Sequence, residues 1–283
     1  MSLEFIPTVW AARLLTALEG SLIYGQAHVS NRDYEGEIRE AGNTVKIASV
    51  GDVTIDDYVK DTNIADPEVL TDDDQSLLID QQKYFNFYVD SVDRAQQNVN
   101  VLDEAMRRSA WKLRDAADKF IAATMSVAVP ADNKIGTAAE PIVPTKDNAY
   151  ELLVDLGVRL DEADVPIDGR FVVIPAWFHG LLLKDDRFVR NGSIRSDRRL
   201  ANGTVGEAAG FSILKSNNVP NVGAAEYKVI AGHSIATAYV EQIVDLQTYK
   251  PEKRFGDAVK GLHVYGAKVL RPTALAMLIA NKE

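Results

Sequence analysis

The chain has 283 residues, of which 46% are hydrophobic and 25% are charged, a composition typical of a globular protein with one large core or two modest ones. It contains no cysteine, which excludes disulfides and thiolate metal sites, and no apolar run approaches the roughly 20 residues that span a bilayer. The net charge of −10 argues against a non-specific nucleic-acid binder, because such proteins carry a basic stripe.

The negative charge is concentrated in one stretch. Between Gly51 and Asp93 there are twelve acidic residues and two lysines, a local charge of −10. Residues 187–199 and 250–271 are basic, each with a local charge of +4. The acidic and basic stretches could be independent solvated faces. Alternatively, they could be complementary surfaces by which one copy of the chain contacts the next, since complementary charges set the register and the choice of partner.

The first predicted element is an amphipathic helix over residues 7–24, with Pro7 near its first turn and apolar residues at helical spacing. Two alternating segments follow, 44–59 and 76–90, and an acidic connection joins them. Such a long connection is rarely found inside a compact domain, so we expect a hairpin arm that leaves the body. Apolar and polar side chains fall on both of its faces, which indicates that another molecule supplies part of its cover.

The strongest helical pattern covers residues 93–126, in which apolar side chains recur at i, i+3, i+4 and i+7. Uninterrupted by proline, this helix would be about 45 Å long and would act as a strut. Its remaining faces carry three opposite-charge pairs at i, i+4 spacing. The pairs are Glu104–Arg108, Arg114–Asp118 and Asp115–Lys119.

An α/β module is predicted from Thr145 to about Thr237. Thr145 or Asp147 would cap a helix with one leucine-rich side, formed by Leu152, Leu153, Leu156 and Leu160. A buried strand at 171–174 and a helix started by Pro175 come next. The final third is rich in strands, which we place within 210–218, 226–234, 236–249 and 256–272.

No arrangement of residues points to catalysis. The glycines at 203, 206 and 210 lack the spacing of a phosphate-binding loop, and the four histidines have no second ligand at helical spacing. Asp72, Asp73 and Asp74 lack the frame of a calcium loop. We therefore expect no catalytic residue, no cofactor and no metal, although an α/β enzyme centred on 145–215 remains an alternative.

The order of these elements resembles that of the major capsid protein of tailed bacteriophages. The segments FIPTVWAARLLTALEGSLIYGQ, NRDYEGEIREAGNTVKI, GEAAGFSILKSNNVP and YKPEKRFGDAVKGLHVYGAKVLRP are similar to the opening and closing segments of that family. The resemblance implies an α+β fold, the Johnson fold, which encapsulins and herpesvirus capsid floors share. An encapsulin-type shell is therefore a second alternative.

The resemblance also implies a division of the chain. The N-terminal arm would be 1–30, the extended E-loop hairpin 31–92, and the peripheral domain with its spine helix 93–140. Residues 141–239 would form the axial domain, and 240–283 the closing strands of the peripheral domain.

The implied function is that of a structural, non-enzymatic coat protein of an icosahedral phage head. Copies of the chain would self-assemble into pentamers and hexamers around double-stranded DNA that they contact only weakly. A separate scaffolding protein and a portal protein are expected partners, and no membrane is. The protein would be made in the cytoplasm of the bacterial host and would act in the virion capsid.

We expect the contact between subunits to join acids of the arm to cations of a neighbour. The acids are Asp56, Asp57, Asp61, Asp72, Asp73 and Asp74, and the cations are Arg195, Arg254 and Lys260.

Overall fold

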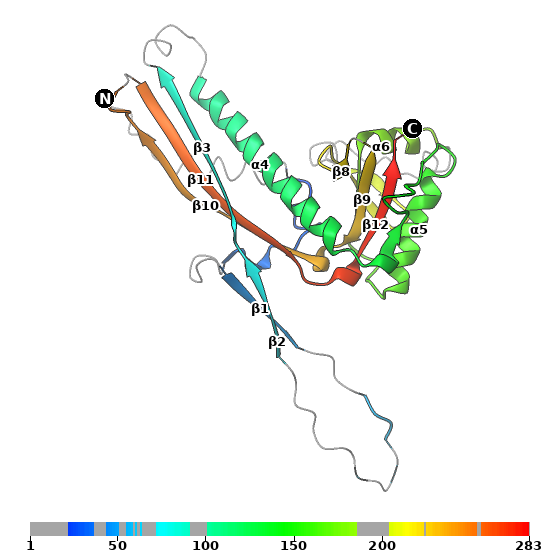
Figure 1. Cartoon of the computed structure of the whole chain (residues 1–283). Coiled ribbons are helices and arrows are strands. Elements are labelled where there is room, and N and C mark those ends of the chain that lie inside the picture. Colours follow the sequence, from blue (N-terminus) through cyan, green and yellow to red (C-terminus); the bar gives the residue numbers. More distant parts are fainter. Residues whose placement is uncertain are drawn as a thin grey trace.

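The computed structural model shows a body from which a long sheet and a hairpin arm extend in different directions (Figure 1). It describes residues 22–36, 44–50, 55–58, 60, 63, 72–90, 101–185, 204–223, 225–253 and 256–282.

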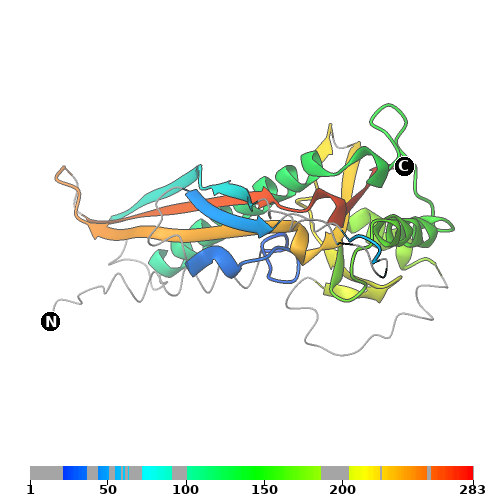
Figure 2. The same cartoon turned by 90° about the horizontal axis from the view of Figure 1, so that it is seen from below.

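The long sheet has three antiparallel strands. Its middle strand is β11 (Gly256–Val269), flanked by β10 (Thr237–Tyr249) and β3 (Gln81–Asp90). The helix α4 (Val101–Ala128) lies along one face of this sheet, which extends to one side of the body (Figures 1 and 2). Because side chains alternate along β11, Val259, His263 and Tyr265 point to the same face of the sheet, where they are buried. The ring of Tyr265 packs edge to face against Phe120 of α4.

The body is built on a seven-stranded mixed sheet. In spatial order its strands are β4 (Lys134–Ile135), β12 (Leu275–Asn281), β9 (Glu226–His233), β5 (Arg170–Ile174), β7 (Phe211–Lys215) and β6 (Thr204–Ala208), with the short β8 (Asn221–Val222) beside β9. Two helices pack in this body, α5 (Ala149–Glu162) and α6 (Ala176–Leu182). Short 3-10 turns η1 (Asp33–Gly36), η2 (Ala131–Asn133), η4 (Ser234–Ala236) and η5 (Pro272–Ala274) connect the elements.

One continuous hydrophobic core joins the body to the helical strut. The C-terminal half of α4 contributes Ala117, Ile121 and Met125, which belong to the same buried cluster as the leucines of α5 and the strands β5, β9 and β12. The body is therefore rigidly attached to α4, and through α4 to the long sheet.

The elements predicted in the body are confirmed. Leu152, Leu153, Leu156 and Leu160 are all buried, β5 is buried along its whole length, and Pro175 precedes the first residue of α6. The predicted cap of α5 is wrong. Asn148 occupies the N-cap position without a side-chain cap bond, and its Oδ1 instead accepts from the amide of Thr145.

The arm is a two-stranded sheet of β1 (Thr44–Val50) and β2 (Asp72–Leu78), paired from Thr44 with Leu78 to Val50 with Asp72. The prediction of one long second strand over 76–90 is wrong, because the chain is interrupted at Ile79 and Asp80. Before this break it pairs with β1, and after it β3 pairs with β11 instead. Alternation alone does not distinguish one strand from two that share a direction.

Two other expectations meet the structure only in part. The long helix is confirmed over 101–128, whereas residues 93–100 lie outside the described part of the chain. The helix predicted at 7–24 also lies outside it except for residues 22–24, which form a bend and turn. Residues 275–281 form β12, which pairs with β9 in the body.

Candidate assembly interface

The arm is anchored where it crosses the long sheet. Ile47, Leu77 and Ile79 pack against Ala238 and Val240 of β10 in a small buried cluster separate from the main core. Alternation along β11 and its pairing with β10 place this cluster on the face of the long sheet opposite α4, which we call the outer face.

The arm approaches the long sheet closely at Gly266. A Cβ atom on this residue would lie 2.4 Å from the backbone oxygen of Leu78, so only glycine fits without a shift. Beside it, Lys268 Nζ donates to the backbone oxygen of Ser76 at 2.9 Å. Part of the arm's cover therefore comes from its own chain.

The segment 22–36 is threaded between α4 and β10. Asp118 of α4 accepts two hydrogen bonds through Oδ1, from the amides of Ile23 at 3.0 Å and Tyr24 at 2.8 Å. Burial raises the pKa of Asp118, although these hydrogen bonds oppose the shift. Farther on, Asn31 exchanges backbone hydrogen bonds with Thr237 and Tyr239 at the start of β10.

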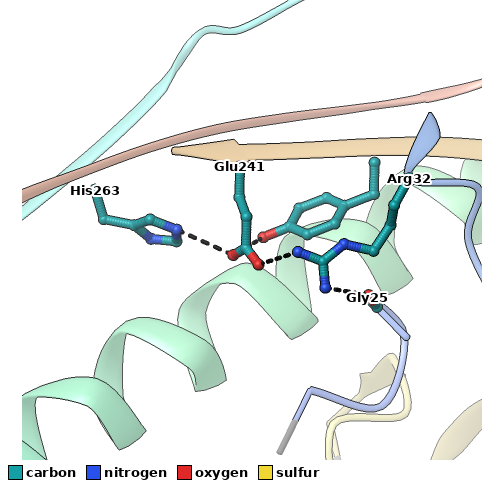
Figure 3. Close-up of polar contacts among 5 residues, drawn as sticks. Gly25, Arg32, Glu241 and His263 are labelled. Atoms are coloured by element: carbon teal, nitrogen blue, oxygen red, sulfur yellow. Dashed lines mark hydrogen bonds and ion pairs between the residues drawn. The ribbon is translucent and has the colours of Figure 1, made fainter. Parts of the chain in front are cut away.

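A buried polar cluster fixes the end of this segment (Figure 3). The carboxylate of Glu241 accepts from Arg32 Nη2 at 2.6 Å, from the Tyr239 hydroxyl at 2.8 Å and from His263 Nε2 at 3.2 Å. Burial would raise the pKa of Glu241, but the His263 hydrogen bond and the Arg32 charge outweigh it and hold this pKa below its ordinary value. The cluster ties residue 32 to both long strands, which sets where the chain leaves for the arm.

Beyond the anchored end, several side chains on the outer face of the long sheet are exposed. Tyr84 is 79% exposed, and Asn86, Gln247 and Lys260 are exposed beside it. Tyr249 shares a 3.2 Å hydrogen bond with Asn86 across the sheet, and Lys260 Nζ lies 5.6 Å from the centroid of its ring. This part combines aromatic surface, amide side chains and one cation.

The predicted interface acids lie at the far end of the arm or beyond it. Asp56 and Asp57 are exposed, between Ile55 at 93% and Tyr58 at 75% exposure. Asp72, Asp73 and Asp74 begin β2, with backbones paired to Val50, Ser49 and Ala48. Asp61, Arg195 and Arg254 lie outside the described residues.

The structure does not bring these acids to Lys260 of the same chain. Lys260 pairs with Asn86, six positions into β3, while Asp72 is at the opposite end of β2. Along the extended backbone the two places are about 45 Å apart. Figure 1 shows the arm and the free end of the long sheet pointing in opposite directions.

Sequence reasoning missed the residues that anchor the segment 22–36. The Arg114–Asp118 surface pair was expected on α4, but Asp118 is buried and binds backbone amides. The other two predicted pairs are confirmed, at 2.9 Å for Arg108–Glu104 and 2.7 Å for Lys119–Asp115. A signal for Glu241 was present, since it is the only charged residue in 236–244, a segment that is mostly apolar or aromatic.

The described residues hold no group of three potential metal-binding side chains. None of the helices in the described ranges is both long and apolar enough to cross a membrane.

A model of the phage capsid protein family matches residues 74–278, which is most of the chain. The chain belongs to the phage capsid protein family. No curated protein sequence matches it. Among solved structures, a protein of Mycobacterium phage Che8 is 31% identical with a TM-score of 0.67, and the match covers 88% of each chain.

More distant structures share the fold of this capsid protein. The capsid of cyanophage P-SCSP1u is 18% identical with a TM-score of 0.65, covering 86% of this chain and 85% of the other. The SrpI encapsulin of Synechococcus elongatus PCC 7942 is 12% identical with a TM-score of 0.59, covering 85% and 83%. The α+β capsid fold expected from the sequence is thus confirmed, and so is its function as a structural major capsid subunit of a phage. The encapsulin alternative is less supported, because that likeness extends to the fold alone.

Proposed function

We propose that the protein assembles into pentamers and hexamers of an icosahedral head that encloses double-stranded DNA, with the arm of each copy lying on the outer face of a neighbour. The observation that carries this proposal is that only one end of the outer face is covered by the chain's own arm. Its one end is buried under the root of the chain's own arm, while the rest, around Tyr84 and Lys260, is exposed.

The arm is suited to that exposed region in shape and charge. A two-stranded sheet is marginally stable by itself, so β1 and β2 gain stability when a second molecule covers them. Ile55, Tyr58 and Leu78 offer exposed apolar surface, and Asp56 and Asp57 offer charge opposite to that of Lys260. Exposed apolar surface of this kind marks interaction sites, and complementary charges fix their register.

The geometry also favours rings. The arm and the surface it would bind lie at opposite ends of one chain, so the contact is head to tail. A head-to-tail contact that closes generates a cyclic assembly. Asp61, Asp72, Asp73 and Asp74 would add to the acidic side, and Arg195 and Arg254 to the basic side.

Several finer features belong to the same proposal. The division into N-terminal arm 1–30, E-loop 31–92, peripheral domain 93–140 with closing strands 240–283, and axial domain 141–239 would assign each surface to a role. The protein would be synthesised in the host cytoplasm and would carry out no catalysis. A separate scaffolding protein and the portal would take part in assembly, and the net charge of −10 would keep contact with packaged DNA weak.

The test is a charge exchange between Asp57 and Lys260, followed by light scattering and negative-stain microscopy with and without a crowding agent or scaffold. We expect rings or shells from the wild type, far fewer from Asp57→Lys or Lys260→Glu alone, and partial recovery in the double variant. Asp132→Lys, at an exposed position in the turn η2 that follows α4, is the matched control. Wild-type shell yield from both single variants would overturn the arm contact.

A further inference from the structure

The helix α5 carries a second apolar strip on its outer side. Its inner side buries Leu152, Leu153, Leu156 and Leu160, as expected for an amphipathic helix. On the outer side, Val154 and Val158 are 40% and 47% exposed. They stand one turn apart, so they form a continuous ridge that the chain's own described residues do not cover.

The ridge has an acidic rim. The exposed residues of α5 and the loop that follows it include six acids and one cation, Arg159. The acids are Glu151, Asp155, Asp161, Glu162, Asp164 and Asp168. Arg159 lies 3.6 Å from Glu162, and the buried Arg170 binds Asp161 at 2.7 Å. The six acids outnumber these two cations, so the rim is net negative.

The same chain contains a segment of complementary composition. Residues 187–200, RFVRNGSIRSDRRL, combine five arginines and one aspartate with Phe188, Val189, Ile194 and Leu200. Arginine suits such a surface, because its planar head binds carboxylates bidentately and its stem packs on apolar side chains. In sequence the segment lies between α6 and β6 of the body to which α5 also belongs.

We propose that the outer side of α5 is an interface between copies, and that its occupant is the arginine-rich segment 187–200 of the next copy around a capsomer. The inference rests on the proposed ring assembly and adds a second head-to-tail contact to it, independent of the arm. The described residues of the same chain leave Val154 and Val158 exposed, and the arginines of the segment complement the acids around them. Since one chain carries both surfaces, the contact is head to tail, and a head-to-tail contact that closes makes a ring.

Two variants test this contact. The face variant is Asp155→Lys with Glu162→Lys, both on the same side of the helix as Val158. The segment variant is Arg195→Glu with Arg198→Glu. Asp132→Lys is the control, and circular dichroism with urea unfolding checks that each variant folds. Capsomers are counted by native mass spectrometry.

We expect capsomers from the wild type and the control, and a yield at least about tenfold lower from each variant alone, because like charges then meet across the contact. An equimolar mixture of the two variants restores attraction only when they alternate around a ring. Alternation requires an even number of subunits, so the mixture should form hexamers of three and three but no pentamers. Both variants combined in one chain should restore hexamers and pentamers alike.

Three results would overturn the inference. In the first, both variants assemble like the wild type. In the second, the face variant fails while the segment variant assembles normally, which would mean that another partner occupies the ridge. The combined chain could also recover while the mixture does not, which would show that the segment binds its own helix. Failure of the folded wild type itself to form capsomers would instead contradict the proposed assembly, and this contact with it.

Discussion

Arg32 Nη2 lies 2.6 Å from the carboxylate of Glu241, although 209 residues separate them in the sequence. The carboxylate side chain is 1% exposed, so this is an interior ion pair completed by Tyr239 and His263. It fastens the segment 22–36 to the long sheet immediately before the chain enters the arm.

Glu241→Gln removes the negative charge but keeps the shape of the side chain. Breaking one partner of a buried pair leaves the other uncompensated, so we expect a loss of about 3 kcal/mol in the free energy of unfolding. Urea unfolding at pH 7 measures this. The exposed Glu252→Gln, in the turn between β10 and β11, should change stability by less than about 0.5 kcal/mol. An equal effect of both variants would contradict the role assigned to the cluster.

The same pair gives a pH dependence of known sign. Because the pKa of Glu241 is lowered in the folded state, its ionised form stabilises the protein above the ordinary carboxyl pKa of about 4.3. This contribution is lost as the pH falls through the lower folded pKa. The stability difference between wild type and Glu241→Gln should therefore be constant at neutral pH and shrink below about pH 4. A difference that grows on acidification would disprove the assignment.

Asp118 should behave in the opposite way. Its raised pKa means that the folded state holds the proton more tightly than the unfolded chain, so its ionisation destabilises the fold as the pH rises through that pKa. Asp118→Asn keeps an oxygen for the amides of Ile23 and Tyr24 without the buried charge, and should be neutral or stabilising at pH 7. Asp118→Ala leaves both amides without an acceptor and should cost about 1–3 kcal/mol.

Thermal unfolding and hydrogen exchange at the Ile23 and Tyr24 amides distinguish the two variants. Faster exchange in Asp118→Ala alone is the expected result. If Asp118→Asn exchanges equally fast, the charge rather than the acceptor geometry holds the segment.

Gly266→Ala should displace the arm. The new Cβ would approach the backbone oxygen of Leu78 at 2.4 Å, and backbone cannot yield as a flexible side chain would. We expect a cost of about 1–3 kcal/mol from overpacking. Proteolysis near 72–80 should accelerate and shell yield should fall. Gly180→Ala, in α6 with nothing within 4 Å of the new methyl, is the control. Unchanged proteolysis in Gly266→Ala would show that the arm tolerates the methyl.

The sequence predicted best what is encoded locally. The leucine spacing of α5, the buried strand at 171–174 and the start of α6 after Pro175 all depend on near neighbours in the chain. The break at Ile79 depends instead on contact with β10 and β11, more than 150 residues later, which alternation does not reveal. Asp118 shows the same limit, since an i, i+4 charge pattern is identical whether the acid meets solvent or buried amides.

The candidate interface was predicted only as a set of charges. The structure places Asp56, Asp57 and Lys260 in exposed positions, while their partners stay predictions because a single chain does not contain the neighbouring copy. Composition identifies which segments carry opposite charge. The register of the contact between copies depends instead on exposed side chains such as Tyr84 and Val158, and no local sequence pattern indicates their exposure.

Ile79 and Asp80, the two residues between β2 and β3, form a joint at which the arm of the capsid subunit could change direction. The described contacts that hold the arm in its direction lie close to this joint: the Gly266 crossing, the Lys268 hydrogen bond and a cluster of five buried side chains. The main core, from α4 to β12, is elsewhere. We therefore expect that a subunit can change the direction of its arm by breaking only the contacts at this joint. That would let one sequence occupy the unequal environments of a closed shell while its body stays unchanged.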